Sequence, residues 1–154
     1  MPTATGDSTV ESKYVIDAGK RLIHVRVWGE MRAQGLIALM RRIGSDPLYR
    51  PDMDAIVDLR EAHGDWDYSE IQRLRDFLAR AAGSERRLWA GVMSPGPLAA
   101  AARMLIVISE PVAPGLQMQL FDEPRSAVRW IRASRRVHGA FLPHRAEQPS
   151  ASVR

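Results

Sequence analysis

Short apolar runs with strand-like character alternate with segments of helical periodicity, and this alternation is the feature that most limits the fold. The strand-like runs cover residues 14–17, 21–28, 54–59, 87–93 and 116–121. The helical patterns cover residues 31–43, 69–81, 98–109 and 124–136. After an opening pair of strands, single strands separated by helices imply a mostly parallel sheet covered by helices. We therefore predict one two-layer α/β domain with about five strands, opened by a β-hairpin, and about four helices.

The clearest strand is segment 21–28, in which side chains alternate strictly between two sides. Ile23, Val25 and Val27 fall on one side. The other side carries Leu22, His24, Arg26 and Trp28. Such alternation predicts a strand with one buried face. Residues 18–20 offer a tight turn, so this strand and segment 14–17 are expected to form the hairpin.

The limits of the domain follow from composition. Residues 1–12 are rich in Thr, Ser, Gly and Pro and are expected to form a flexible N-terminal segment, and residues 143–154 a flexible tail. The domain is predicted to span residues 13–142, with 137–142 as a packing arm or a short edge strand. We expect no signal peptide and no transmembrane segment, because the longest apolar run, 104–108, is far too short to cross a bilayer.

Cysteine content and charge exclude several classes of function. The 154 residues include no cysteine, which rules out a disulfide scaffold, a cysteine nucleophile and a thiolate metal site. The chain suits a reducing compartment, and a cytoplasmic location is expected. Lys and Arg number 22 against 18 Asp and Glu, a formal charge of only +4. That excess is too small to indicate a dedicated nucleic-acid binder, so no nucleic-acid partner is predicted.

Several short segments within residues 14–131 carry a family resemblance. They are Val-Trp-Gly-Glu at 27–30, Asp-Pro-Leu-Tyr at 46–49 followed by 54–60, and Leu-Phe-Asp at 120–122 followed by 127–131. Together they resemble the SpoIIAA-like branch of the STAS superfamily, the anti-sigma-factor-antagonist fold. The resemblance implies a small bacterial domain of the protein-interaction type. It also implies that phosphorylation switches some members of the wider superfamily, and that some bind small or lipid-like ligands.

Ser69 is the candidate phosphorylation site that the resemblance implies. In the regulatory members a phosphorylatable serine follows the central strand closely, whereas residues 60–68 intervene here. The residues themselves favour a structural role. Ser69 opens a helical pattern, and Gln72 three positions later completes a capping-box spacing, so we expect Ser69 to be the helix N-cap.

The polar loop predicted at 61–68 is the most function-like stretch, because it follows the carboxyl end of a central strand, where open α/β sheets usually bind ligands. Its candidate ligand or partner residues are His63, Asp65, Trp66, Asp67 and Tyr68. His63 with a neighbouring acid is chemically able to hold a metal or act as a base. The spacing matches no established metal motif, however, and no metal site is predicted. An ordinary surface loop is the alternative.

The helical segment 98–109 is apolar on nearly all sides, which is typical of a helix that is deeply buried or that lines a pocket or an interface. Its candidate interface or pocket residues are Leu98, Met104, Leu105 and Ile108. Near the C-terminus, Arg129, Arg132, Arg135 and Arg136 form a basic stripe that is expected to be a solvated helix face.

No combination of residues forms a recognisable catalytic set, and no cofactor is predicted. The favoured hypothesis is a non-enzymatic STAS-like regulatory or interaction domain, bound to a protein partner or to itself as a homodimer. The first alternative is a binding protein for a small apolar or lipid-like molecule with an anionic head, held by an arginine. The weaker alternative is a hydrolase using His63, Asp65 and Asp67.

Overall fold

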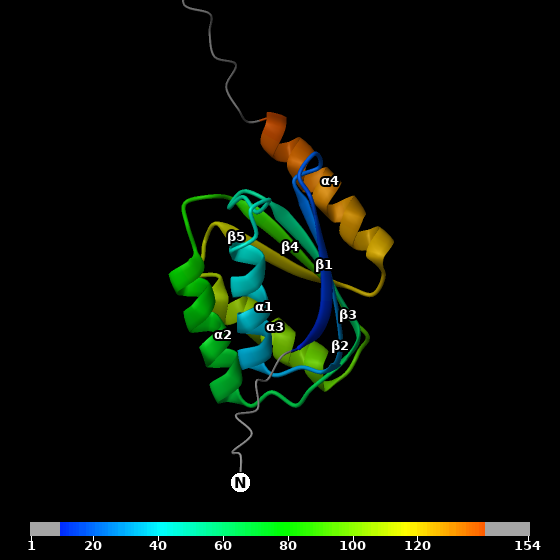
Figure 1. The fold of residues 1–154 in the computed structure, drawn as a ribbon, viewed down its shortest axis with the longest axis vertical. Coiled ribbons are helices and arrows are strands. Elements are labelled where there is room, and N and C mark those ends of the chain that lie inside the picture. Colours follow the sequence, from blue (N-terminus) through cyan, green and yellow to red (C-terminus); the bar gives the residue numbers. More distant parts are fainter. Residues whose placement is uncertain (1–9, 141–154) are drawn as a thin grey trace, which may run out of the picture.

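The computed structural model describes residues 10–140, which form five strands and four helices around one sheet (Figure 1). In chain order these are β1 (Glu11–Asp17), β2 (Leu22–Glu30), α1 (Ala33–Gly44), β3 (Asp54–His63), α2 (Tyr68–Ala81), β4 (Arg87–Val92), α3 (Pro97–Ser109), β5 (Leu116–Phe121) and α4 (Pro124–Ala140). The strands lie in the order β1-β2-β3-β4-β5. Strands β1 and β2 are antiparallel, and the other neighbours are parallel. This confirms the predicted fold class.

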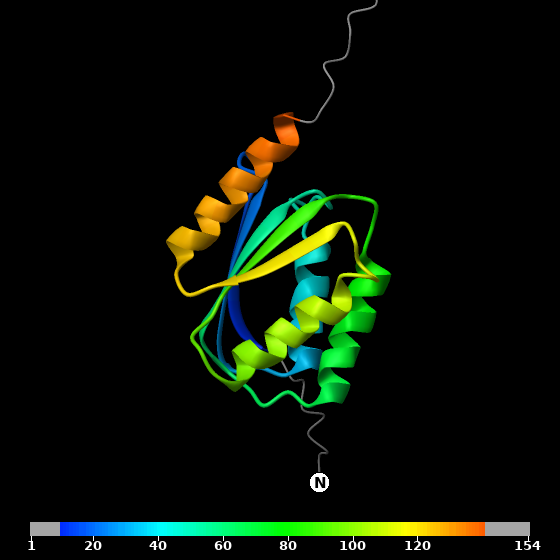
Figure 2. The ribbon, with the colours of Figure 1, turned by 180° about the vertical axis from the view of Figure 1, so that it is seen from behind.

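Helices cover both faces of the sheet. Helices α1, α2 and α3 lie on one face, whereas α4 lies alone on the other (Figures 1 and 2). Side chains of β2 alternate between the two faces and pack against helices on each. Ile23, Val25 and Val27 are buried with α1–α3, and Leu22 is buried on the α4 side. His24, beyond the cover of α4, is exposed as a strand surface residue. Helix α4 thus adds a partial third layer to the two that the pattern predicts.

Strands β2 and β3 both run further than the sequence indicates. Gly29 does not end β2, because its backbone takes a φ of 74° that glycine adopts at little cost, and the strand continues to Glu30. Next to it, β3 continues to His63, with Trp28 opposite Glu61 and Glu30 opposite His63. The predicted loop at 61–68 is therefore wrong in extent: only residues 64–67 separate β3 from α2.

The ends of the folded region also differ from the prediction. Strand β1 begins at Glu11 and Val10 is buried, so residues 11 and 12 belong to the sheet and Val10 to the core, rather than to the N-terminal segment. At the other end α4 continues to Ala140, which replaces the arm or edge strand expected from residue 137. Residues 1–9 and 141–154, including the predicted tail, lie outside the described residues.

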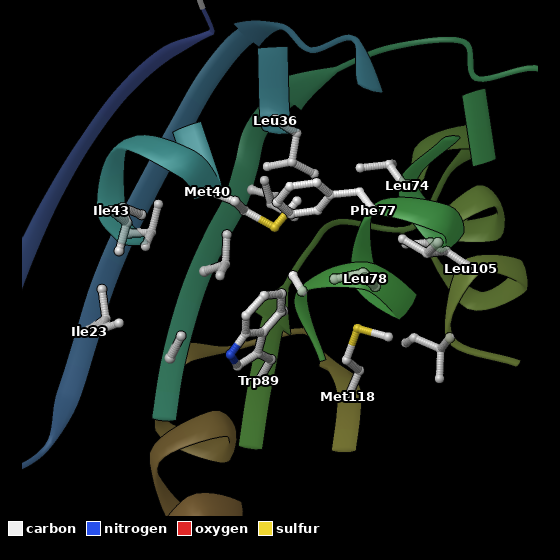
Figure 3. A pocket seen from close by; sticks show the side chains of 18 of the residues that line it. Ile23, Leu36, Met40, Ile43, Leu74, Phe77, Leu78, Trp89, Leu105 and Met118 are labelled. Atoms are coloured by element: carbon white, nitrogen blue, oxygen red, sulfur yellow. The ribbon is translucent and has the colours of Figure 1, made fainter. Parts of the chain in front are cut away.

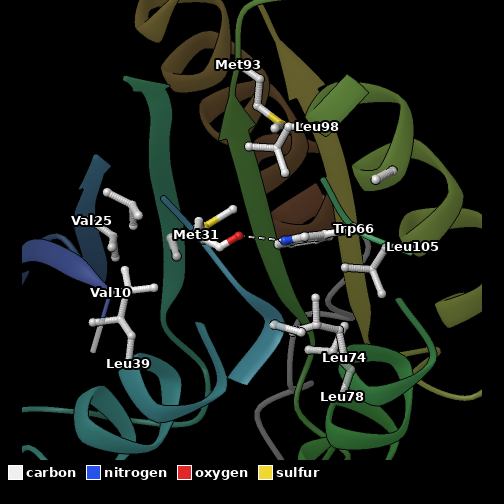
Figure 4. Close-up of a cluster of buried hydrophobic side chains, with 14 of the residues drawn as sticks. Val10, Val25, Met31, Leu39, Trp66, Leu74, Leu78, Met93, Leu98 and Leu105 are labelled. Atoms are coloured by element: carbon white, nitrogen blue, oxygen red, sulfur yellow. Dashed lines mark hydrogen bonds between the residues drawn. The ribbon is translucent and has the colours of Figure 1, made fainter. Parts of the chain in front are cut away.

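The main hydrophobic core lies between the sheet and helices α1–α3 (Figure 4). Trp66, in the short segment before α2, is 8% exposed and belongs to this core. Its indole Nε1–H donates to the Met31 carbonyl oxygen at 2.8 Å. The Met31 N–H in turn donates to the carbonyl oxygen of His63 at 2.8 Å. These two bonds fasten the segment after β3 to the start of α1.

Candidate functional site

A cavity of about 390 Å³ lies between the sheet and helices α1–α3 (Figure 3). Four strands form its floor, from which Trp89 and Met118 face Met40 and Phe77 of the helices. Ligand pockets typically have volumes of roughly 300–1,000 Å³ and apolar linings. The further aliphatic lining residues include Ile23, Val25, Leu36, Ile43, Val57, Leu59, Leu74, Leu78, Leu105 and Leu120.

The cavity exists because the helices do not fully cover the middle of the sheet. Val57, Leu59 and Trp89 belong to the central strands β3 and β4, yet each remains only partly buried. Side chains on buried parallel strands are usually covered on both faces. Ala55 of β3 and Gly91 of β4 also line the floor, and the Leu120 side chain lies against Gly91. The site therefore presents apolar surface that the protein itself does not bury.

Arg87, the first residue of β4, is the buried charged group of this pocket. It is 7% exposed and lines the cavity. Its Nη1 donates to the Tyr49 hydroxyl at 3.1 Å and its Nη2 to the Ala81 carbonyl oxygen at 3.2 Å. Its guanidinium carbon lies 5.6 Å from the centroid of the Trp89 ring. Within residues 10–140 no carboxylate forms a salt bridge with Arg87, so its hydrogen-bond partners are all neutral oxygens.

A second arginine lines the pocket without being buried. Arg41 of α1 is exposed, and its guanidinium carbon lies 5.5 Å from the ring centroid of Phe77. Because water solvates this charge, it is available only at the surface of the pocket. The buried positive charge of the site is that of Arg87.

The candidate loop residues do not converge on a site. His63 ends β3 with an exposed side chain, and Asp65 and Tyr68 are also exposed. Trp66 lines the cavity, but as a buried core residue rather than as an exposed contact. In the described structure no hydrogen bond joins His63 to an aspartate. No group of three His, Asp or Glu side chains suited to a metal occurs between residues 10 and 140.

Asp67, not Ser69, is the N-cap of α2. Its Oδ1 accepts the Glu70 backbone N–H at 2.9 Å and the Ser69 hydroxyl at 2.7 Å. These hydrogen bonds, with the Ser69 hydroxyl contributing most, lower the pKa of Asp67 below its ordinary value of 3.8. The N-cap therefore lies two residues before the predicted Ser69. Ser69 is exposed in the first turn of α2, and its phosphorylation stays a prediction.

The candidate residues of α3 fall into two groups. Leu105 lines the cavity, and Leu98 and Ile108 pack in the same core. Met104 lies on the outer side and is 47% exposed, close to Val107 with 69%. A groove of about 440 Å³ beside β5 continues from this helix, and it shares Ile106, Met118 and Gln119 with the cavity. None of the helices within residues 10–140 combines the length and apolarity needed to cross a membrane.

Sequence reasoning missed Tyr49, Arg87 and Trp89 as site residues. They come from a loop and a strand that are separated by β3 and α2, and only the fold brings them to one cavity. The single local signal is Arg87 itself, a charge at the start of an otherwise apolar strand. Within Arg-Leu-Trp-Ala-Gly-Val-Met at 87–93, strand alternation places Arg87 on the same side as Trp89.

The fold is similar to that of a solved structure, an uncharacterised protein from the DUF3478 family with a SpoIIAA-like fold from Shewanella loihica PV-4. The match covers 77% of this chain and 92% of that chain, with a TM-score of 0.50 and 14% sequence identity. No protein-family model and no curated protein matches the sequence. At this identity the likeness concerns the fold, and it confirms the SpoIIAA-like architecture that the sequence motifs predict.

Proposed function

We propose that this protein binds a small, lipid-like molecule with an apolar body and an anionic head in the cavity between the sheet and helices α1–α3. The observation that carries the proposal is the cavity of about 390 Å³ with its nearly continuous apolar lining. Each Å² of apolar surface removed from water contributes about 25 cal/mol, so a ligand that covers this lining would gain substantial affinity. Such pockets usually hold ligands through apolar contact and a few polar groups.

The chemistry of the lining favours binding over catalysis. Among the cavity residues there is no Ser, Thr, Cys, His, Lys, Asp or Glu. The polar side chains are those of Arg41, Tyr49, Arg87 and Gln119. Nucleophilic and acid–base catalysis draw mainly on the residue types that are missing here. A molecule held in this cavity would meet groups that orient it rather than groups that react with it.

A neutral fluorescent probe tests the proposal directly. N-phenyl-1-naphthylamine should bind the full-length protein with increased emission, because the cavity offers an apolar site of suitable size. Ala102→Phe should fill the cavity from α3 and weaken binding about tenfold or more. Ala100→Phe is the matched control, since Ala100 is exposed on the same helix and does not line the cavity. A wild-type protein that binds no probe would overturn the proposal.

The open edge of β5 favours a second candidate function, self-association as an interaction module. Strand β5 carries no charged residue, although charges are the usual protection of an exposed edge. Arg86 precedes β4, and its Nη2 donates to the Gln117 side chain near the start of β5 at 3.4 Å. If β5 paired antiparallel with β5 of a second copy, this arginine would lie near Asp122 and Glu123, which follow the other copy's β5. All three are exposed and form no salt bridge within the described residues.

Sedimentation velocity with edge variants tests this second candidate. The wild-type chain should sediment as a dimer, and Gln119→Lys should shift it to a monomer by placing two like charges across the paired strands. Gln72→Lys, at an exposed position of α2, adds the same charge away from the edge and should leave the dimer intact. A monomeric wild-type chain at every concentration would exclude the edge as a site of self-association.

A further inference from the structure

We infer that Arg87 holds the head group of the bound molecule and that this head is a carboxylate. The ligand class is then a fatty-acid-like molecule, one carboxylate on a hydrocarbon body. The inference rests on the proposed function, because it concerns the same cavity. It adds the residue that recognises the ligand, the chemistry of the recognised group and the direction in which the ligand lies.

Arg87 is buried, and no carboxylate within residues 10–140 forms a salt bridge with it. Arginine is rarely fully buried unless it is paired, because desolvation of the cation costs free energy. The Ala81 carbonyl at the end of α2 supplies only part of the helix dipole, which amounts to about half a unit of negative charge. In contrast, Arg135 meets the buried Asp54 carboxylate at 2.6 Å. Arg87 is therefore a buried cation whose described hydrogen-bond partners are both neutral oxygens, and a carboxylate is the group that would balance its charge.

The guanidinium group of Arg87 has more N–H donors than its described contacts use. It has five N–H donors, and the described contacts use one on Nη1 and one on Nη2. The remaining donors match the two oxygens of a carboxylate, which arginine binds as a planar fork. The Trp89 ring beside the guanidinium supports its position through a cation–π contact. Both side chains line the cavity, so a ligand would reach the free donors from the apolar space.

The single buried charge of Arg87 favours a carboxylate over a phosphate as the head group, and the shape of the lining indicates where the ligand body would lie. A phosphate monoester carries about −1.5 to −2 charges at neutral pH, more than one buried arginine neutralises. A carboxylate carries a single negative charge, which balances the one buried cation of the pocket, Arg87, while the charge of the exposed Arg41 is solvated by water. The head would lie at the amino end of β4, where Arg87 and Tyr49 meet. The hydrocarbon body would extend across the floor toward Leu59, Trp66 and Met93, which line the cavity near the carboxyl ends of the strands.

A matched pair of ligands tests the head group without any variant. Dodecanoic acid and dodecan-1-ol share one hydrocarbon chain, and each would displace the naphthylamine probe from the full-length wild-type protein. We expect the acid to bind about tenfold more tightly or better, since a charge-assisted hydrogen bond exceeds a neutral one by more than 1 kcal/mol, or about tenfold. Equal affinities for the two would overturn the inference and leave the proposed function standing. Failure of both to bind would overturn the proposed function itself.

Variants at two adjacent arginines then assign the residue. Arg87→Met should lower the affinity for the acid to that for the alcohol and leave alcohol binding unchanged. Arg86→Met is the control, because Arg86 is exposed, lines the edge groove and does not line the cavity, and both affinities should stay as in the wild type. If Arg87→Met weakens acid and alcohol equally, Arg87 only supports the pocket and the inference is wrong. If that variant does not fold, Arg87→Lys should still prefer the acid, and a loss of the preference only in Arg86→Met would refute the assignment.

Discussion

The two faces of the sheet are packed in opposite ways. On the α4 face, the helix and the sheet share a continuous hydrophobic cluster in which Ala90, Val92 and Ala127 are fully buried. On the α1–α3 face, larger residues such as Met40, Phe77 and Trp89 meet without filling the space between them. The two faces therefore differ in the space they leave between helix and sheet, and the cavity lies on the α1–α3 face.

Two arginines, the half-buried Arg135 and the buried Arg87, follow the same division. Arg135 closes the α4 face by bonding to Asp54 and to the backbone oxygens of Lys20 and Arg21. Asp54 also accepts the Leu88 N–H at 2.8 Å, so this ion pair is satisfied on both sides. Arg87, on the cavity face, lacks such an anion among residues 10–140. The two arginines thus differ in their partners: Arg135 meets a carboxylate, and Arg87 meets a hydroxyl and a carbonyl oxygen.

The largest effect is expected from breaking the ion pair on the α4 face. Asp54→Ala should lower the free energy of unfolding by about 3 kcal/mol, because it leaves Arg135 and the Leu88 N–H without their partner. Urea unfolding measures the change. The control is Asp52→Ala, which removes an exposed ion pair with Arg21 and should cost no more than about 1 kcal/mol. Equal costs for the two variants would contradict a structural role for Arg135.

The next largest difference between the two faces is expected when a small residue on each face is replaced by a larger one. Ala90→Leu on the α4 face should destabilise the protein by about 1–3 kcal/mol, because no space remains between β4 and α4. Ala102→Leu on the cavity face should change stability by no more than about 0.5 kcal/mol, since the added atoms enter an existing cavity. Thermal unfolding of both variants checks the contrast. A cost at Ala102 that matches that at Ala90 would mean that the α1–α3 face is as tightly packed as its opposite.

A smaller effect is expected from removing the unpaired charge. In the absence of ligand, Arg87→Met should alter the free energy of unfolding by less than about 1 kcal/mol, because the lost hydrogen bonds are offset by relief from burying a cation. The measurement is urea unfolding of ligand-free protein, in parallel with Asp54→Ala. A loss as large as that of Asp54→Ala would show that Arg87 is structural and would weaken the contrast between the two arginines.

The smallest effect is expected from the exposed cap of α2. Because the folded-state pKa of Asp67 lies below its ordinary value of 3.8, its ionised form stabilises the fold above that pH. This contribution should disappear as the pH falls from about 4 through the lowered pKa. Asp67→Asn keeps a capping side chain but removes the charge, so its stability should approach that of the wild type as the pH falls. Unfolding curves from pH 7 to acid measure this, and a gap that widens in acid would refute the assignment.

The local patterns predicted the fold better than its boundaries. Strand β5 begins and ends at the predicted residues because apolar alternation and the flanking Pro and Gly act locally. The extension of β3 to His63 was not visible, because it depends on pairing with Trp28 and Glu30 of β2. The cap of α2 moved from Ser69 to Asp67 for a similar reason, since Trp66 is fixed to the Met31 carbonyl and sets where the helix begins.

The candidate site depended still more on tertiary structure. A helix rich in apolar residues suggested a pocket or an interface, and Leu105 does line the cavity. The loop at 61–68 suggested a polar site, but its side chains do not come together. Tyr49, Arg87 and Trp89 are brought together by the parallel order of the sheet and the loop before β3. The spacing of these three residues along the sequence does not predict that they lie together.

The sequence by itself determined the order of strands and helices and the apolar side of each, because periodicity and turn residues act over a few positions. Only the tertiary structure decided how much space remains between the layers, because that volume depends on side chains from seven elements packing at once. It also decided which arginine meets a buried carboxylate, because Asp54 and Arg135 are far apart in the chain and adjacent only in the fold.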